Sequence, residues 1–300
     1  MKIGTILREG THRPALFEGD DVIELPAASV LELIGTPEKL AELARTGRPT
    51  MTLSEAVLAP PIPRPGKLLC LALNNSANKD RILRGPDHPA LFPKPASCLI
   101  GSGAPIELRP YYGRVHPEPE LALVIGKGGR DIAAEDAYGH VFGYTILNDL
   151  TSPTMREDDS FHYRAIHPGE NGAVRHVDTW VSYPGRYKGT DGFGPIGPWI
   201  VTRDEIPDPH DLTVRCLHQG RVVTEDNTAN LFYKVPEVIA FVSAYMTLEV
   251  GDIISLGTAL KSAAAGGRAV QTVDLNQQGG PIEVSISGIG TLSNPVARHE

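Results

Sequence analysis

The chain has 300 residues, with 28 Lys and Arg against 36 Asp and Glu, so its formal net charge is −8. This acidic balance argues against a nucleic-acid or anionic-membrane surface, which needs a basic face, although a single pocket can still be positive. Hydrophobic residues make up 41% of the sequence, which excludes a disordered chain. The longest apolar runs are far too short to cross a bilayer.

The cysteines and the start of the chain favour a cytoplasmic protein. Cys70, Cys98 and Cys216 are far apart and odd in number, so they form neither a CxxC pair nor a disulfide framework. We expect them to be reduced, buried thiols. No charged start followed by an apolar stretch stands near Met1, which argues against a secretory signal.

Residues 1–60 are predicted to form a small N-terminal α+β domain. Its expected strands and helices lie at 2–7, 22–25, 29–34 and 37–45. Four prolines then follow within a few positions, which neither a helix nor a central strand tolerates. We therefore expect a stiff, extended linker at 61–66.

Residues 67–300 are predicted to form a larger, mostly β domain. Its short apolar runs alternate with turns, as is typical of strands. The strands are expected at 67–73, 97–100, 120–125, 141–147, 199–201, 212–218, 252–255 and 282–286. Two helices are expected, at 133–138 and 236–245. Strands without regular helix alternation argue against a Rossmann fold or a TIM barrel and predict an α+β fold.

Residues 151–187 form a weakly periodic segment that is rich in His and Arg. A long irregular segment inside a compact domain is often a lid or a binding loop. Its candidates for substrate contact are Arg156, His162 and His167. A solvated surface excursion is the alternative.

The clearest chemical constellation lies at 116–126. Strand side chains alternate between faces, so Glu118 and Glu120 point the same way. Their repulsion can be relieved by a divalent cation or by solvent. Asp149 follows another predicted strand, and three carboxylates would make a hard oxygen site for Mg²⁺, Mn²⁺ or Ca²⁺. The residues alone leave open a solvated edge for the glutamates and a turn cap for Asp149.

Several segments of the chain, in order, resemble the fumarylacetoacetate hydrolase family. They include Glu118-Pro-Glu120-Leu-Ala-Leu-Val-Ile-Gly-Lys127 and Gly143-Tyr-Thr-Ile-Leu-Asn-Asp149. The others are 63–74, 91–101, 194–202, 246–258 and 286–296. The resemblance covers roughly residues 62 to 296, with order and spacing largely kept.

The resemblance implies a mixed β-roll or sandwich catalytic domain, commonly in a homodimer. It implies a Mg²⁺-type ion, and the positions that match the family's ligands are Glu118, Glu120 and Asp149. It also places Lys188 near the substrate and Lys94 and Thr258 in the pocket wall. Family substrates are small 2-oxo and β-diketo acids, whose enolate the metal stabilises as a Lewis acid.

One segment departs from the family's pattern. Family hydrolases carry a His and an acidic residue shortly after the first strand, and that pair activates water. Here Asn78, a further candidate for substrate contact, stands at the His position and Arg81 near the acidic position. A neutral amide cannot act as a general base. Pro153 and Arg156 also fill positions where family members often carry Arg and Gln.

We predict a metal-dependent hydrolase that cleaves a C–C bond in a small 2-oxo or β-diketo carboxylate. It would need a substitute base, and the candidates are His88, His162, His167 and His176. Decarboxylation or isomerisation needs the enolate but no activated water, and is the close alternative. A non-catalytic protein that binds metal and oxo acids is the third.

Overall fold

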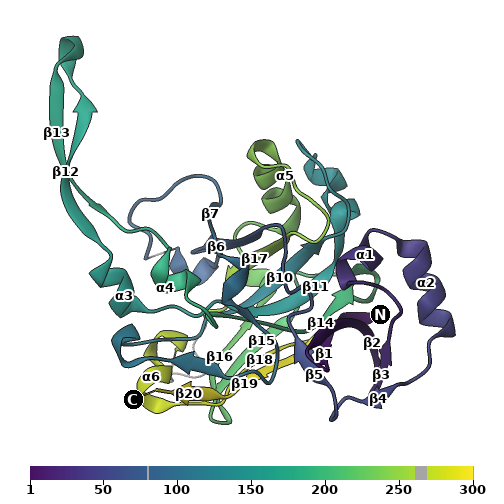
Figure 1. Ribbon diagram of the computed structural model, residues 1–300. Helices are drawn as coiled ribbons and strands as arrows, with labels where there is room; N and C mark the ends of the chain where they lie inside the picture. Colours follow the sequence, from purple (N-terminus) through teal and green to yellow (C-terminus); the bar gives the residue numbers. More distant parts are fainter. Residues whose placement is uncertain (80, 261–268, 300) are drawn as a thin grey trace.

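The computed structural model describes residues 1–79, 81–260 and 269–299. Within them, one sheet of twelve strands runs in the order β4-β3-β2-β1-β14-β11-β10-β17-β6-β7, with β5 paired to β1 and β8 to β14 (Figure 1). Its strands are β1 (Lys2–Arg8), β2 (Thr11–Glu18), β3 (Asp21–Glu24), β4 (Met51–Thr52), β5 (Val57–Ala59), β6 (Leu68–Ala72), β7 (Ala90–Pro93), β8 (Leu99–Ile100), β10 (Pro119–Ile125), β11 (Val141–Asn148), β14 (Gly194–Thr202) and β17 (Ile253–Thr258). The predicted mostly β fold is confirmed.

A second sheet packs against the first, because β15 and β18 contact β10 and β11. In the described residues it runs β16-β15-β18-β19, and β20 pairs separately with β9. These strands are β9 (Ile106–Leu108), β15 (Thr213–His218), β16 (Arg221–Asn227), β18 (Ile282–Ile286), β19 (Gly290–Asn294) and β20 (Val296–Arg298). Side chains of both sheets share one apolar core. This packing holds in place the strand ends at which the candidate site, described below, lies.

Short helices connect the strands. The α-helices are α1 (Val30–Ile34), α2 (Pro37–Thr46), α3 (Pro153–Asp158), α4 (Arg186–Gly189), α5 (Val235–Tyr245) and α6 (Leu275–Gln278). The 3₁₀ helices are η1 (Ser76–Asn78), η2 (Ala96–Cys98), η3 (Pro110–Tyr112), η4 (Ala134–His140), η5 (Glu170–Gly172), η6 (Arg203–Glu205), η7 (Thr228–Asn230) and η8 (Val270–Thr272). The helix predicted at 133–138 is thus a 3₁₀ helix. Among the described residues, none of the helices is long and apolar enough to cross a membrane.

The N-terminal strands continue the sheet formed by the strands of residues 67–300. β1 pairs antiparallel with β14, where Ile3 lies opposite Ile200. The Pro-rich segment also packs on β1, because the Thr5 hydroxyl donates to the Pro61 carbonyl at 2.8 Å and Ile62 is buried. The division into domains at 61–66 stays a prediction, and so does the homodimer.

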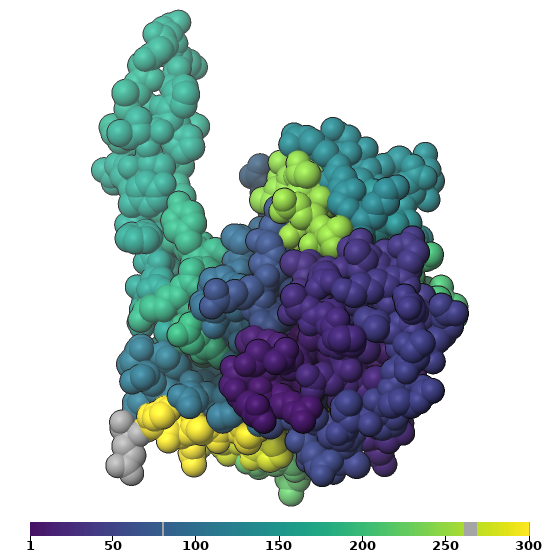
Figure 2. All heavy atoms as spheres, turned by 45° about the vertical axis from the view of Figure 1, so that its right-hand side comes forward, coloured from purple at the N-terminus to yellow at the C-terminus, as the bar shows by residue number. Residues whose placement is uncertain are grey.

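The segment 151–187 is regular, not irregular as predicted. Between α3 and α4 lies a hairpin of β12 (Phe161–Pro168) and β13 (Val174–Val181), which stands away from the rest of the molecule (Figures 1 and 2). His162 stacks on Trp180, with ring centroids 4.4 Å apart. The sequence pattern concealed these strands because most side chains on both faces are exposed, so no alternation of apolar and polar residues marks them.

Shortening the exposed hairpin tests whether it contributes to the thermal stability of the fold. We expect a variant with an Asn-Gly turn in place of 166–176 to unfold within about 2 °C of the wild type, because β12 and β13 pack mainly on each other. Thermal unfolding followed by circular dichroism measures this. A drop of more than about 5 °C would contradict it. Turnover by the same variant tests the predicted lid.

The three cysteines are free and buried, in agreement with the sequence. Burial raises the pKa of the Cys98 thiol to about 11, and it raises the pKa of Cys70 and Cys216 as well. The thiolate is the reactive form of cysteine, so these side chains serve as small apolar core residues.

Candidate functional site

Two neighbouring antiparallel strands bring three carboxylates together. Pro119 begins β10, which is buried along its whole length, and lies opposite Asn148 at the end of β11. The Asp149 amide donates to the Glu118 carbonyl, and the Glu118 amide donates to Asn148 Oδ1, both at 2.9 Å. The start of one strand therefore lies beside the end of the other. One oxygen each of Glu118, Glu120 and Asp149 lies within 4.8 Å of the others.

Two buried lysines neutralise part of this charge. Lys94 Nζ donates to Asp149 Oδ1 and, at 2.9 Å, to the Phe193 carbonyl. Lys188 Nζ donates to Asp149 Oδ2 at 2.5 Å and to Glu118 Oε2 at 2.7 Å. Burial disfavours the charged form of Lys188, but the negative charges of Asp149 and Glu118 have the larger combined effect and raise the pKa of Lys188. Burial likewise disfavours the charged form of Asp149, but the positive charges and hydrogen bonds of Lys188 and Lys94 have the larger combined effect and lower the pKa of Asp149.

Glu120 receives its hydrogen bonds from hydroxyl groups. Ser255 Oγ donates to Oε2 at 2.5 Å and Thr258 Oγ1 to Oε1 at 2.9 Å. Burial, together with the Asp149 and Glu118 charges, raises the pKa of Glu120 to about 8. When Glu120 is ionised, three carboxylates face two ammonium groups, and a divalent cation would more than offset the one excess negative charge. The oxygen-only donor set fits a hard cation such as Mg²⁺ or Mn²⁺.

A cavity of about 550 Å³ opens onto this cluster. Glu118, Lys188 and Thr258 line its polar side. Glu120, Asp149 and Lys94 lie behind them and are not among the described residues that line the cavity. Asn78 and Arg156 line it too. Its apolar wall is formed by Leu71, Ala72, Leu73, Ala90, Leu91, Phe92 and Leu260.

The predicted substitute bases do not line this cavity. His162 and His167 belong to β12 and His176 to β13, while His88 stacks on Phe241 with ring centroids 5.0 Å apart. In the described part of the chain, none of these four histidines is among the residues around the cavity.

His116 is the cavity histidine that sequence reasoning missed. Its Nε2 lies 3.1 Å from Glu118 Oε1, and its side chain lines the cavity. Burial lowers its pKa, although the Glu118 charge opposes this. The signal was available in the sequence, because residues two apart in an extended segment share a face.

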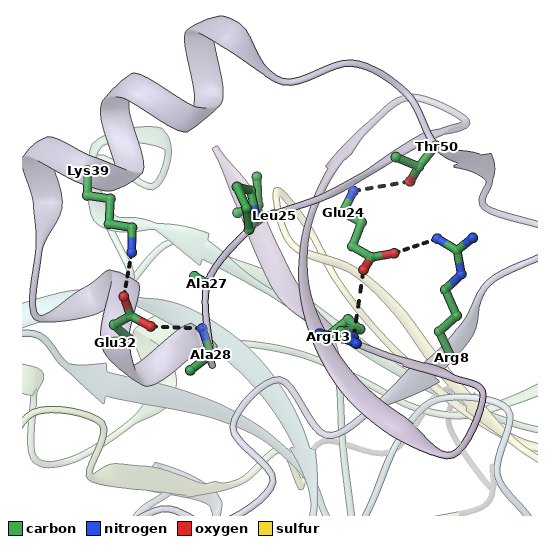
Figure 3. Close-up of a pocket in the computed structure, with 10 residues that line it drawn as sticks. Arg8, Arg13, Glu24, Leu25, Ala27, Ala28, Glu32, Lys39 and Thr50 are labelled. Carbon is green, nitrogen blue, oxygen red and sulfur yellow. Dashed lines mark hydrogen bonds and ion pairs between the residues drawn. The ribbon is translucent and has the colours of Figure 1, made fainter.

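A larger hollow, of about 730 Å³, lies in the N-terminal part of the chain (Figure 3). Its charged side chains are already paired. Arg8 and Arg13 lie 2.6 Å and 3.8 Å from Glu24, and Lys39 lies 2.5 Å from Glu32. The smaller cavity, with its carboxylate cluster, is therefore the candidate site.

A family model described as "Fumarylacetoacetate (FAA) hydrolase C-terminal" matches residues 67–297. The chain belongs to the fumarylacetoacetate hydrolase family. This result confirms the resemblance drawn from the sequence segments.

Relatives of the chain have names that give different activities or none. The chain is 33% identical to "Protein Rv2993c" of Mycobacterium tuberculosis, over 99% of this chain and 98% of that protein. It is 31% identical to "Oxaloacetate tautomerase YisK" of Bacillus subtilis, over 94% of this chain and 89% of that protein. A maleylpyruvate hydrolase from Sphingobium sp. SYK-6, solved with manganese(II) and pyruvate, is 26% identical with a TM-score of 0.73, and both chains are fully covered.

Proposed function

We propose that this protein is a divalent-metal-dependent enzyme that interconverts the enol and keto forms of a small 2-oxo carboxylate. One observation supports the proposal: a carboxylate cluster that could hold a metal ion and a wall formed by Asn78 and Arg81 adjoin the same cavity. By resemblance, Asn78 and Arg81 stand near the positions of the family's water-activating pair. Tautomerisation needs a stabilised enolate and no activated water. The oxaloacetate tautomerase named among the relatives supports this choice.

The residues of the cluster have distinct tasks in this proposal. Glu118, Glu120 and Asp149 would hold the cation, which supplies Lewis-acid stabilisation of an enolate oxygen when bound. Lys188 remains protonated beside them and adds positive charge where the oxyanion develops. Thr258 donates to both glutamates, at 3.3 Å and 2.9 Å, and so orients their carboxylates.

Hydrolysis of a C–C bond is the second candidate. The maleylpyruvate hydrolase among the solved neighbours favours it, and so does His116, the imidazole that the cavity offers. It differs from tautomerisation in its products, because a hydrolase releases two fragments.

Turnover of oxaloacetate and of an acylpyruvate, with Mg²⁺ or Mn²⁺ and with EDTA, separates the candidates. We expect EDTA-sensitive loss of the enol absorbance of oxaloacetate and no cleavage of the acylpyruvate. Cleavage of the acylpyruvate would assign a hydrolase, and pyruvate formed from oxaloacetate would assign a decarboxylase. No reaction in the metal-loaded protein would leave a non-catalytic binder. Glu118→Gln is the inactive control.

A further inference from the structure

One bulky apolar residue at the cavity has a strained backbone. Leu73 directly follows β6, and its φ is +57°. Residues other than glycine rarely adopt this left-handed conformation, and those that do are mainly Asn and Asp. Such strain persists only where the surrounding structure enforces it, and it is most common at functional sites. A leucine held in this conformation therefore points to a function for its side chain.

Asn74 enforces the turn at Leu73. Its buried side chain donates to the Leu256 and Tyr233 carbonyls at 2.8 Å and 3.1 Å and accepts from the Tyr233 amide at 2.8 Å. Gly257 passes so close that a Cβ atom there would lie 2.9 Å from Asn74 Cβ. These contacts fix Asn74 against β17, so the chain turns just before it. The turn leaves the Leu73 side chain 59% exposed at the cavity.

Leu73 lies in the apolar wall of the cavity. Strands β6 and β7 pair antiparallel at this wall, and Leu91, Phe92 and Leu260 extend the apolar surface around Leu73. Glu118 of the carboxylate cluster lines the same cavity. A molecule in this space can therefore reach the cluster with one end and the apolar wall with the other.

The cavity is larger than a metal-chelating group alone requires. Its volume of about 550 Å³ equals that of about eighteen water molecules at about 30 Å³ each. A 2-oxo carboxylate group has only a few non-hydrogen atoms, so it fills a small part of this space. Displacing water from apolar surface is favourable, so an apolar substituent on the ligand would add affinity.

We infer that the apolar wall binds an alkyl or aryl substituent of the substrate and that Leu73 is a specificity-determining residue. The substrate class is therefore the 2-oxo acids that carry an uncharged, apolar group on the side remote from the metal site. This inference rests on the proposed function for the assignment of the 2-oxo carboxylate end to the carboxylate cluster. Oxaloacetate has a second carboxylate in place of such a group, so we expect it to bind more weakly than an apolar 2-oxo acid of the same length.

Calorimetry on the Mn²⁺-loaded protein tests the inference without turnover. The probes are lactate, 2-hydroxybutyrate, 2-hydroxyvalerate and 2-hydroxycaproate, which differ only in the length of an alkyl chain. Malate is added because it replaces the terminal methyl group of 2-hydroxybutyrate by a carboxylate. We expect the affinity to rise about 2- to 4-fold with each methylene, and malate to bind more weakly than 2-hydroxybutyrate.

Variants of Leu73 test its part in this preference. Leu73→Asn removes apolar surface, and asparagine tolerates the left-handed conformation, so the variant should fold. It should weaken 2-hydroxycaproate about 5- to 20-fold and leave lactate unchanged. Leu73→Met keeps an apolar side chain and should keep the dependence on chain length. Leu83→Asn is the matched control, because Leu83 is 98% exposed and is not among the described residues around the cavity.

Three outcomes would overturn the inference. The first is an affinity that does not rise from lactate to 2-hydroxycaproate. The second is tighter binding of malate than of 2-hydroxybutyrate, which would assign the remote end to a carboxylate. The third is equal weakening of lactate and 2-hydroxycaproate by Leu73→Asn, which would mean that Leu73 acts only by holding the turn. If the proposed function fails instead, no 2-oxo acid is turned over, while the dependence of binding on chain length persists.

Discussion

Asp149→Ala is expected to lower the free energy of unfolding by about 3–5 kcal/mol, because it removes the carboxylate that pairs with the buried Lys94 and one of the two that pair with the buried Lys188. Lys94 and Lys188 both donate to Asp149, and Asp149 is 1% exposed. A role as a metal ligand alone would predict a variant that keeps its fold and loses only activity. The loss of stability is expected because the Asp149 carboxylate is also part of a buried ion network.

Urea denaturation of the metal-free protein measures the effect. The control is Asp178→Ala, which removes an aspartate from the exposed pair with Arg164 and should cost less than about 1 kcal/mol. Similar losses in the two variants would show that the buried lysines do not depend on Asp149.

Glu120→Gln is expected to make the metal-free protein more stable above neutral pH while abolishing Mn²⁺ binding. The pKa of Glu120 lies near 8 in the folded protein, against an ordinary value of 4.5. The folded state therefore binds the proton more tightly than the unfolded state. The stability that this group contributes is complete below about pH 4.5 and is lost as the pH rises through about 8. The wild type should lose about 2–5 kcal/mol over this window.

A series of urea denaturation curves between these pH values, in EDTA, tests the prediction. The glutamine variant should show a flatter dependence on pH than the wild type. Glu225→Gln, which alters an exposed pair with Arg215, is the control and should follow the wild type. A wild-type slope in Glu120→Gln, or Mn²⁺ binding that survives the change, would contradict the assignment of this carboxylate.

The candidate site could be predicted where its geometry is local. Glu118 and Glu120 share a face because they are two residues apart in an extended segment, and Asp149 was placed by the end of its strand. The contacts of Lys94 and Lys188 with Asp149 span 55 and 39 positions. No local pattern encodes such a pairing, so only the family resemblance pointed to these lysines.

The fold was predictable where burial leaves a pattern. Buried strands such as β10 and β11 are recognisable in the sequence as apolar runs. Helix α5 is recognisable by the apolar stripe along one of its faces. The hairpin of β12 and β13 lies in solvent on both faces, so its strands depend on pairing alone. His162 and His167 gained their candidate role from the composition of that segment, and the structure shows them on strands that do not line the cavity.

The pairing of β1 with β14 has a consequence for any shortened form of the chain. Ile200 and Val201 of β14 have Ile3 and Lys2 as their partners on that side. A chain begun at the Pro-rich segment would leave their backbone groups open along an apolar strand. Open strand edges of this kind recruit other strands and cause aggregation. The first residues thus protect β14 from self-association, and a fragment without them should accumulate as insoluble material.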